Sequence, residues 1–98
     1  MLKMQERVAP RLPERPRLAA GVRLHFDERR DLWLLLGPER IIETEGPASE
    51  ILQRCDGSRT VEQIVDELAK LYAADRDEIV NDVTGMLSEL VMKRMLVG

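Results

Sequence analysis

Residues 22–47 read VRLHFDERRDLWLLLGPERIIETEGP, and the pattern of this stretch decides the fold. Residues 22–26 alternate apolar and polar side chains, which is the period of a half-buried strand. Leu32–Leu36 is a continuous apolar run, which favours a strand covered on both faces. After the break at Gly37, residues 40–44 resume the extended pattern. The short connections predict a three-stranded antiparallel meander.

From Gly46 onward the apolar residues follow a helical period instead. A first helix is expected to begin at Pro47, since proline suits a first turn, and to end at Gly57. Thr60 opens a capping box for a second helix, and an aspartate near residue 75 caps a third that runs to about residue 93. The sequence therefore predicts an α+β, winged-helix-like fold in which a three-stranded antiparallel sheet precedes a three-helix bundle.

The third predicted helix carries an unusually broad apolar stripe, about 140° wide where about 100° would seat a helix on a core. Gly85 lies within this stripe, although glycine costs about 1 kcal/mol relative to alanine in a helix. A small residue there would let another chain approach the backbone closely. Two interpretations stay open: the stripe is one wall of a binding groove, or it is simply central core.

The chain is short enough to be a single domain, and its charge is distributed unevenly. Residues 1–17 are rich in proline and arginine and are predicted to be a flexible arm, with residues 18–98 as the folded domain. The arm could also anchor on a second copy and make a homodimer. The rest of the chain is acidic: residues 60–98 hold eight acidic and four basic groups, which argues against nucleic acid as a partner.

Several kinds of chemistry are not supported by the sequence. One cysteine, Cys55, allows no internal disulfide and fits a reducing cytoplasm, and on its apolar helical face it is expected to be buried and inert. His25 has no histidine or cysteine at ligand spacing, so no metal site is expected, and no cofactor is called for. No apolar run is long enough to span a membrane. No catalytic residue is predicted, and the chain is not expected to be an enzyme.

The third predicted strand is preceded by Leu36-Gly37-Pro38-Glu39-Arg40, which contains a Leu-x-Pro-Glu motif. The passage Cys55-Asp56-Gly57-x-x-Thr60 connects two predicted helices through an Asp-Gly and a threonine. Together these segments resemble the PqqD family, the coenzyme PQQ synthesis proteins D that act as recognition elements for ribosomal peptides. The resemblance covers residues 16–98.

The resemblance implies a non-catalytic peptide chaperone in pyrroloquinoline quinone biosynthesis. Its implied partners are the precursor peptide PqqA and the radical-SAM enzyme PqqE, which crosslinks that peptide. The peptide would add as a strand beside the third strand and lie against the third helix. Carried onto this sequence, the peptide-binding residues are Arg40, Ile41, Ile42, Glu43, Thr44, Asp82, Val83, Met86, Leu87 and Leu90.

Two other functions remain as alternatives. The apolar groove and the basic arm could carry the anionic quinone product. A winged helix could also bind DNA, although exposed carboxylates such as Glu78, Asp82 and Glu89 on the last helix would repel phosphate.

Overall fold

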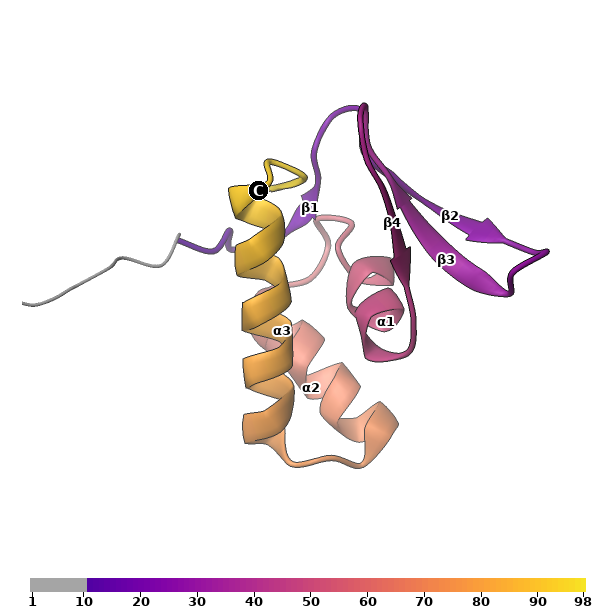
Figure 1. Cartoon of the computed structure of the whole chain (residues 1–98). Coiled ribbons are helices and arrows are strands. Elements are labelled where there is room, and N and C mark those ends of the chain that lie inside the picture. The colour runs from indigo at the N-terminus through magenta and orange to yellow at the C-terminus, as the bar shows by residue number, and fades with distance from the viewer. Residues whose placement is uncertain (1–10) are drawn as a thin grey trace, which may run out of the picture.

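The computed structural model describes residues 11–98, and its sheet is the predicted meander (Figure 1). The strands β2 (Arg23–Asp27), β3 (Leu32–Leu36) and β4 (Ile41–Thr44) pair antiparallel in the order β2-β3-β4. Leu35 is the centre of the register, paired with Leu24 on one side and Ile42 on the other. Because the sheet ends at β4, this strand has one edge that no described strand occupies.

Three helices follow the sheet: α1 (Pro47–Gln53), α2 (Val61–Tyr72) and α3 (Arg76–Met92). The capping box is present, because the Thr60 side chain accepts from the Gln63 amide and the Gln63 side chain accepts from the Thr60 amide. These contacts satisfy amides that a helix start leaves without partners. The α+β, winged-helix-like architecture predicted from the sequence is confirmed.

The first helix is shorter than predicted. It ends at Gln53, and Cys55 lies in the connection rather than on the helix. Gly57 does adopt the left-handed conformation expected of it, with φ of 86°, but it serves the turn before α2 and not the end of α1. The apolar period extends past the end of the helix because Cys55, although it lies in the loop, is buried in the core.

The core forms where the three helices meet the inner face of the sheet. Leu35 is the sheet's fully buried contribution, and its partner on β4, Ile42, packs against the same cluster. Burial of such aliphatic side chains supplies most of the favourable free energy in a domain of this size. The buried apolar residues are Leu35, Ile51, Leu52, Cys55, Ile64, Val65, Leu68, Ile79, Val83, Leu87, Leu90, Met95 and Leu96.

The strand β3 is covered on one face only, contrary to the prediction from its apolar run. Leu34 and Leu36 lie half-buried on the outer face, where their neighbours on β4 are the exposed Glu43 and Ile41. In Figure 1 the sheet extends away from the helices, which lie on one side of it. A continuous apolar run therefore overestimated the burial of this strand.

A second, two-stranded sheet joins the two ends of the described chain. The strands β1 (Arg17–Leu18) and β5 (Leu96–Val97) pair antiparallel. Residues just before β1 are also attached to the domain, because Pro16 is buried and its carbonyl accepts from the Gly57 amide at 3.0 Å. Of the predicted arm, residues 11–17 thus contact the domain, while residues 1–10 and the predicted pairing of two copies lie outside what the structure describes.

Candidate binding groove

Every second residue of β4 directs its amide and carbonyl to the free edge of the strand. The geometry of the β3–β4 hairpin determines which residues these are. The Gly37 amide donates to the Arg40 carbonyl at 2.9 Å, so Gly37 and Arg40 form a hydrogen-bonded pair. Such pairs alternate along an antiparallel ladder. Ile42 and Thr44 therefore direct their amides and carbonyls towards β3, whereas Ile41 and Glu43 direct theirs to the open edge.

The side chains of β4 follow the same alternation. Ile42 and Thr44 lie towards the core, and the buried Thr44 hydroxyl donates to the Trp33 carbonyl at 3.0 Å. Ile41 is 69% exposed, and Glu43 is held on the outer surface by Arg30, with Oε2 and Nη1 2.8 Å apart. A chain that pairs with this edge would thus meet backbone groups on the edge and a large apolar side chain above it.

One hollow, of about 520 Å³, lies where the end of β4 and the start of α1 meet α3. Its buried floor is Ile51 of α1, and its α3 wall carries Met86 between two carboxylates. These α3 residues recur three and four positions apart, which puts them on one helix face. The lining residues are Glu45, Pro47, Ala48, Ile51, Asp82, Met86 and Glu89.

A second hollow, of about 280 Å³, lies at the other end of β4. It is bounded by the β3–β4 turn and by the residues after α3, where Arg94 takes a left-handed conformation with φ of 61°. Its lining residues are Ala20, Val22, Gly37, Pro38, Glu39, Arg40, Lys93, Arg94 and Met95. The two hollows and the open edge of β4 between them are called the groove below.

The predicted site residues divide into two groups. Asp82 and Met86 line the first hollow and Arg40 the second, while residues 41–44 form the strand between them. Val83, Leu87 and Leu90 are at most 4% exposed and belong to the core. Most of the broad stripe on α3 is therefore core, and the half-buried Met86 lines the first hollow.

Sequence reasoning missed the residues that flank the groove. Pro47 was assigned only to the start of a helix and residue 93 only to the end of one, and neither was expected at a groove. The signal for them lay in the topology. In a meander followed by three helices, the residues after the edge strand and after the last helix come to the ends of the same groove.

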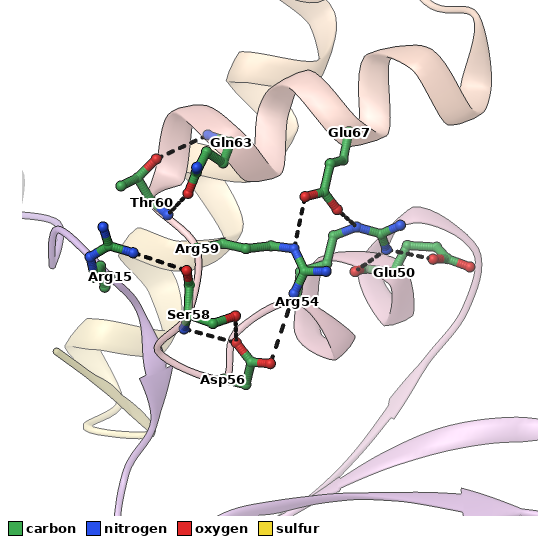
Figure 2. A network of polar contacts seen from close by, with 9 residues as sticks. All are labelled: Arg15, Glu50, Arg54, Asp56, Ser58, Arg59, Thr60, Gln63 and Glu67. Carbon is green, nitrogen blue, oxygen red and sulfur yellow. Dashed lines mark hydrogen bonds and ion pairs between the residues drawn. The ribbon is translucent and has the colours of Figure 1, made fainter.

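An ion-pair network ties α1 and the α1–α2 connection to α2 (Figure 2). Glu67 of α2 lies between two arginines of the α1–α2 connection, with Oε1 2.9 Å from Arg54 Nε and Oε2 2.8 Å from Arg59 Nε. Arg54 also contacts Glu50 Oε1 at 2.7 Å. The hydrogen bonds from Arg59 and then Arg54 hold the pKa of Glu67 below its usual 4.5. The network positions α1, whose Ile51 is the groove floor.

Two features of the described residues bear on metal binding and on cysteine chemistry. Between residues 11 and 98, no group of three or more histidine, cysteine or acidic side chains is placed to hold a metal ion. Cys55 is buried as predicted, its thiol donates to the Ile51 carbonyl, and burial raises its pKa to about 12. A thiol held so fully protonated is a poor nucleophile. No helix in the described part of the chain is both long and apolar enough to cross a membrane.

The fold and the groove together define a small winged-helix-like module with a strand edge available to an added chain. The sequence model of coenzyme PQQ synthesis protein D (PqqD) matches residues 33–96. The PqqA binding protein of Rhodopseudomonas palustris (strain BisB5) is 49% identical over 82 residues, which cover 84% of this chain and 80% of that protein. The chain belongs to the PqqD family.

Other relatives support the assignment. The PqqA binding protein of Xanthomonas oryzae pv. oryzae (strain PXO99A) is 46% identical over 81 residues, covering 83% of this chain and 88% of that protein. The solution structure of the PqqD truncation of Methylobacterium extorquens PqqCD, described as a stand-alone RiPP recognition element, superposes with a TM-score of 0.72 at 43% identity, covering 85% and 88% of the two chains. The crystal structure of PqqD from Xanthomonas campestris gives a TM-score of 0.54 at 44% identity, covering 79% and 86%.

Proposed function

We propose that this chain is a non-catalytic peptide-binding protein that holds a PqqA-type precursor peptide for a separate modifying enzyme in pyrroloquinoline quinone synthesis. The observation that carries the proposal is the open edge of β4 with a hollow at each end. An unpaired edge satisfies an extended peptide through main-chain hydrogen bonds, and neighbouring hollows receive alternate side chains. The names of the relatives, PqqA binding proteins, agree with this choice of ligand.

In this proposal the predicted site residues have distinct roles. Ile41 and Glu43 hydrogen-bond the peptide backbone. Met86 contacts an apolar peptide side chain, to which its flexible thioether can adapt. Arg40 and Asp82 meet polar or charged peptide groups at the two ends of the groove. The remaining residues of the predicted set, Ile42, Thr44, Val83, Leu87 and Leu90, support this surface from beneath.

The test is a calorimetric titration of the folded chain with synthetic PqqA of R. palustris, together with Ile41→Pro. Proline at position 41 removes an amide that faces the open edge, and edge strands tolerate it there. One lost hydrogen bond should weaken binding roughly three- to tenfold. Ile41→Ala is the matched control, because it removes the same side chain and keeps the amide.

Two results would contradict the proposal in different ways. If wild-type protein does not bind PqqA, the peptide is not its ligand. If Ile41→Pro binds as well as Ile41→Ala while both remain folded by circular dichroism, the peptide does not pair with β4. Ile42→Pro marks the other face of the strand: its amide points to β3, so this variant should destabilise the sheet itself.

We further propose that the enzyme served is the radical-SAM protein PqqE. The groove leaves the outer face of the sheet and α2 uncovered by the peptide, so an enzyme has surface to contact while the peptide is held. Size-exclusion chromatography of the chain, PqqA and PqqE should give a ternary complex. Elution of PqqE at its own volume in the presence of the loaded chain would count against this partner.

A further inference from the structure

The two ends of the groove carry opposite charge. The hollow beside the β3–β4 turn is lined by three cationic residues, Arg40, Lys93 and Arg94, and by one carboxylate, Glu39. The hollow at the other end is lined by three carboxylates, Glu45, Asp82 and Glu89, and by no cationic residue. A ligand that spans the groove therefore meets a basic end and an acidic end.

Five of these charges are available to a ligand, and one of them, the exposed Glu39, opposes the arginines that line the same hollow. Lys93 and Glu89 pair with each other at 2.9 Å, one from each hollow, and largely cancel. Arg40, Arg94, Glu45 and Asp82 are all exposed, and none of them forms an ion pair with another residue of the range 11–98. After the Lys93–Glu89 pair is removed, two arginines and Glu39 remain at one end, a net charge of +1, and two carboxylates remain at the other, a net charge of −2.

The two walls of the groove are β4 and α3. On each wall, the acidic and the basic residue are separated by a similar distance. Arg40 and Glu45 flank β4 and are five residues apart, which is about 16 Å of extended chain. Asp82 and Arg94 are twelve residues apart along α3 and its end, which is about 18 Å of helix. The strand and the helix run in opposite directions here, because each hollow takes residues from both. An extended peptide matches this spacing with charges about five residues apart.

We infer that the groove selects an extended peptide segment with a basic residue towards its N-terminus and an acidic residue about five positions later, and that this charge order sets the direction in which the peptide binds. This inference rests on the proposed function. A strand added antiparallel to β4 places its N-terminal part beside Glu45 and its C-terminal part beside Arg40. Antiparallel addition continues the existing sheet, in which every pair is antiparallel, and is slightly the more stable pairing.

The charges at the two ends of the groove affect the direction in which the peptide binds more than they raise its affinity. Exposed ion pairs are individually weak and are screened by salt. A reversed peptide, however, would put like charges together at both ends, and repulsion of this kind is a common source of specificity. Reversing both charges at one end of the groove should weaken binding of the native peptide about three- to thirtyfold, with a smaller effect at high salt.

The experiment uses the full chain and PqqA of R. palustris, with a nitroxide spin label at either end of the peptide segment that the protein protects. The N-terminal label should broaden the amide resonances of residues 45, 46 and 48 by paramagnetic relaxation. The C-terminal label should broaden those of residues 37, 39, 40 and 93–95. The bound segment should carry the basic residue before the acidic one.

Charge-reversal variants test how much these charges contribute to the affinity for the peptide. Arg40→Glu with Arg94→Glu, and separately Glu45→Lys with Asp82→Lys, should each weaken PqqA binding. Glu62→Lys with Glu78→Lys is the matched control for the second pair, since it makes the same change of net charge at exposed helix positions outside both hollows. The control should bind PqqA as the wild type does.

The outcomes separate this inference from the function on which it rests. Binding of PqqA in the opposite direction, through a segment without this charge order, or with affinity and salt dependence unaffected by the reversals, overturns the inference and leaves the peptide-binding function intact. Failure of the wild-type chain to bind PqqA at all overturns both.

Discussion

At the scale of single residues, Cys55 couples the stability of the fold to pH. Its thiol is 3% exposed, and burial, then the neighbouring Asp56 charge, raises its pKa from 9.0 to about 12. The raised pKa means that the unfolded chain loses this proton first. The contribution of Cys55 is therefore complete below pH 9 and is lost as pH rises towards 12.

The prediction for Cys55 is a steeper alkaline loss of stability in the wild type than in Cys55→Ala. The difference should reach at most about 1.4 kcal/mol per pH unit between these two values. Urea denaturation at a series of alkaline pH values measures it, and the comparison removes the contributions of lysine and tyrosine. Parallel pH profiles for the two proteins would mean that the thiol ionises as readily folded as unfolded.

Gly85 is a second residue with a measurable consequence. A Cβ built at this position of α3 meets nothing within 4 Å, and the backbone there is helical. Gly85→Ala should therefore raise the free energy of unfolding by about 1 kcal/mol, measured by urea denaturation. A decrease would show that another part of the chain covers this position.

The same variant tests why a glycine stands there. If PqqA binding weakens in the more stable Gly85→Ala protein, the peptide backbone passes close to α3 at this point, as the sequence suggested. Unchanged affinity would confine the contact to the face that carries Asp82 and Met86.

At the scale of elements, the contact between α1 and α2 depends on Glu67. The hydrogen bonds that lower its pKa also tie the α1–α2 connection to α2. A lowered pKa means that this stabilisation is present above pH 4.5 and is lost as pH falls through the folded-state value. Glu67→Gln should lower the melting temperature at pH 7, and its effect should diminish as the pH falls below 4.5 through the folded-state pKa and the wild-type carboxylate becomes protonated.

Glu62→Gln on the same helix is the control for Glu67→Gln. Its side chain is 79% exposed, and its nearest cation, Arg76, lies 3.9 Å away. It should change the melting temperature much less, because exposed ion pairs contribute little. Equal effects of the two substitutions would mean that the network in Figure 2 does not hold the helices together.

Most elements could be predicted from local pattern, and the exceptions have physical reasons. The meander and α3 each repeat a period over several residues, and the capping box is a short local motif, so a sequence displays all three directly. The strands β1 and β5 have two residues each and so no period, and their pairing depends on contacts between distant parts of the chain. The burial of β3 was overestimated because an apolar run does not reveal whether a second layer exists.

The groove was predictable in part for the same reason. The strand and the helix that form its walls were identified from the family motifs and the apolar stripe. Met86 lies at the groove, whereas Leu87 and Leu90 lie in the core. Helical spacing alone could not distinguish these positions, because all three residues belong to the same broad apolar stripe of α3. The charges come from the two ends of β4, from α3 and from the residues directly after it, and only the tertiary fold brings them together.

At the scale of the whole molecule, the β1–β5 pairing closes the domain. Leu96 is 3% exposed and belongs to the core, whereas its neighbour Val97 is 40% exposed. Leu96→Ala should reduce the free energy of unfolding by about 2–5 kcal/mol, as buried leucines do, and Val97→Ala by no more than about 0.5 kcal/mol. Urea denaturation of both variants checks the difference. Similar values would mean that the C-terminal strand is not part of the cooperative unit.

The same pairing determines how the domain responds to tension. Arg17 pairs with Val97 at the end of the ladder from which both chain ends leave, and Leu18 pairs with Leu96 behind it. A force that separates the two ends loads these pairs one after the other, as a zipper is opened, rather than all at once. The ladder should therefore yield at low force in a single-molecule experiment, while β4 and α3 lie outside the first step. A linker joined to either end would therefore load these pairs before it loads Ala20 and Met95, which line the groove.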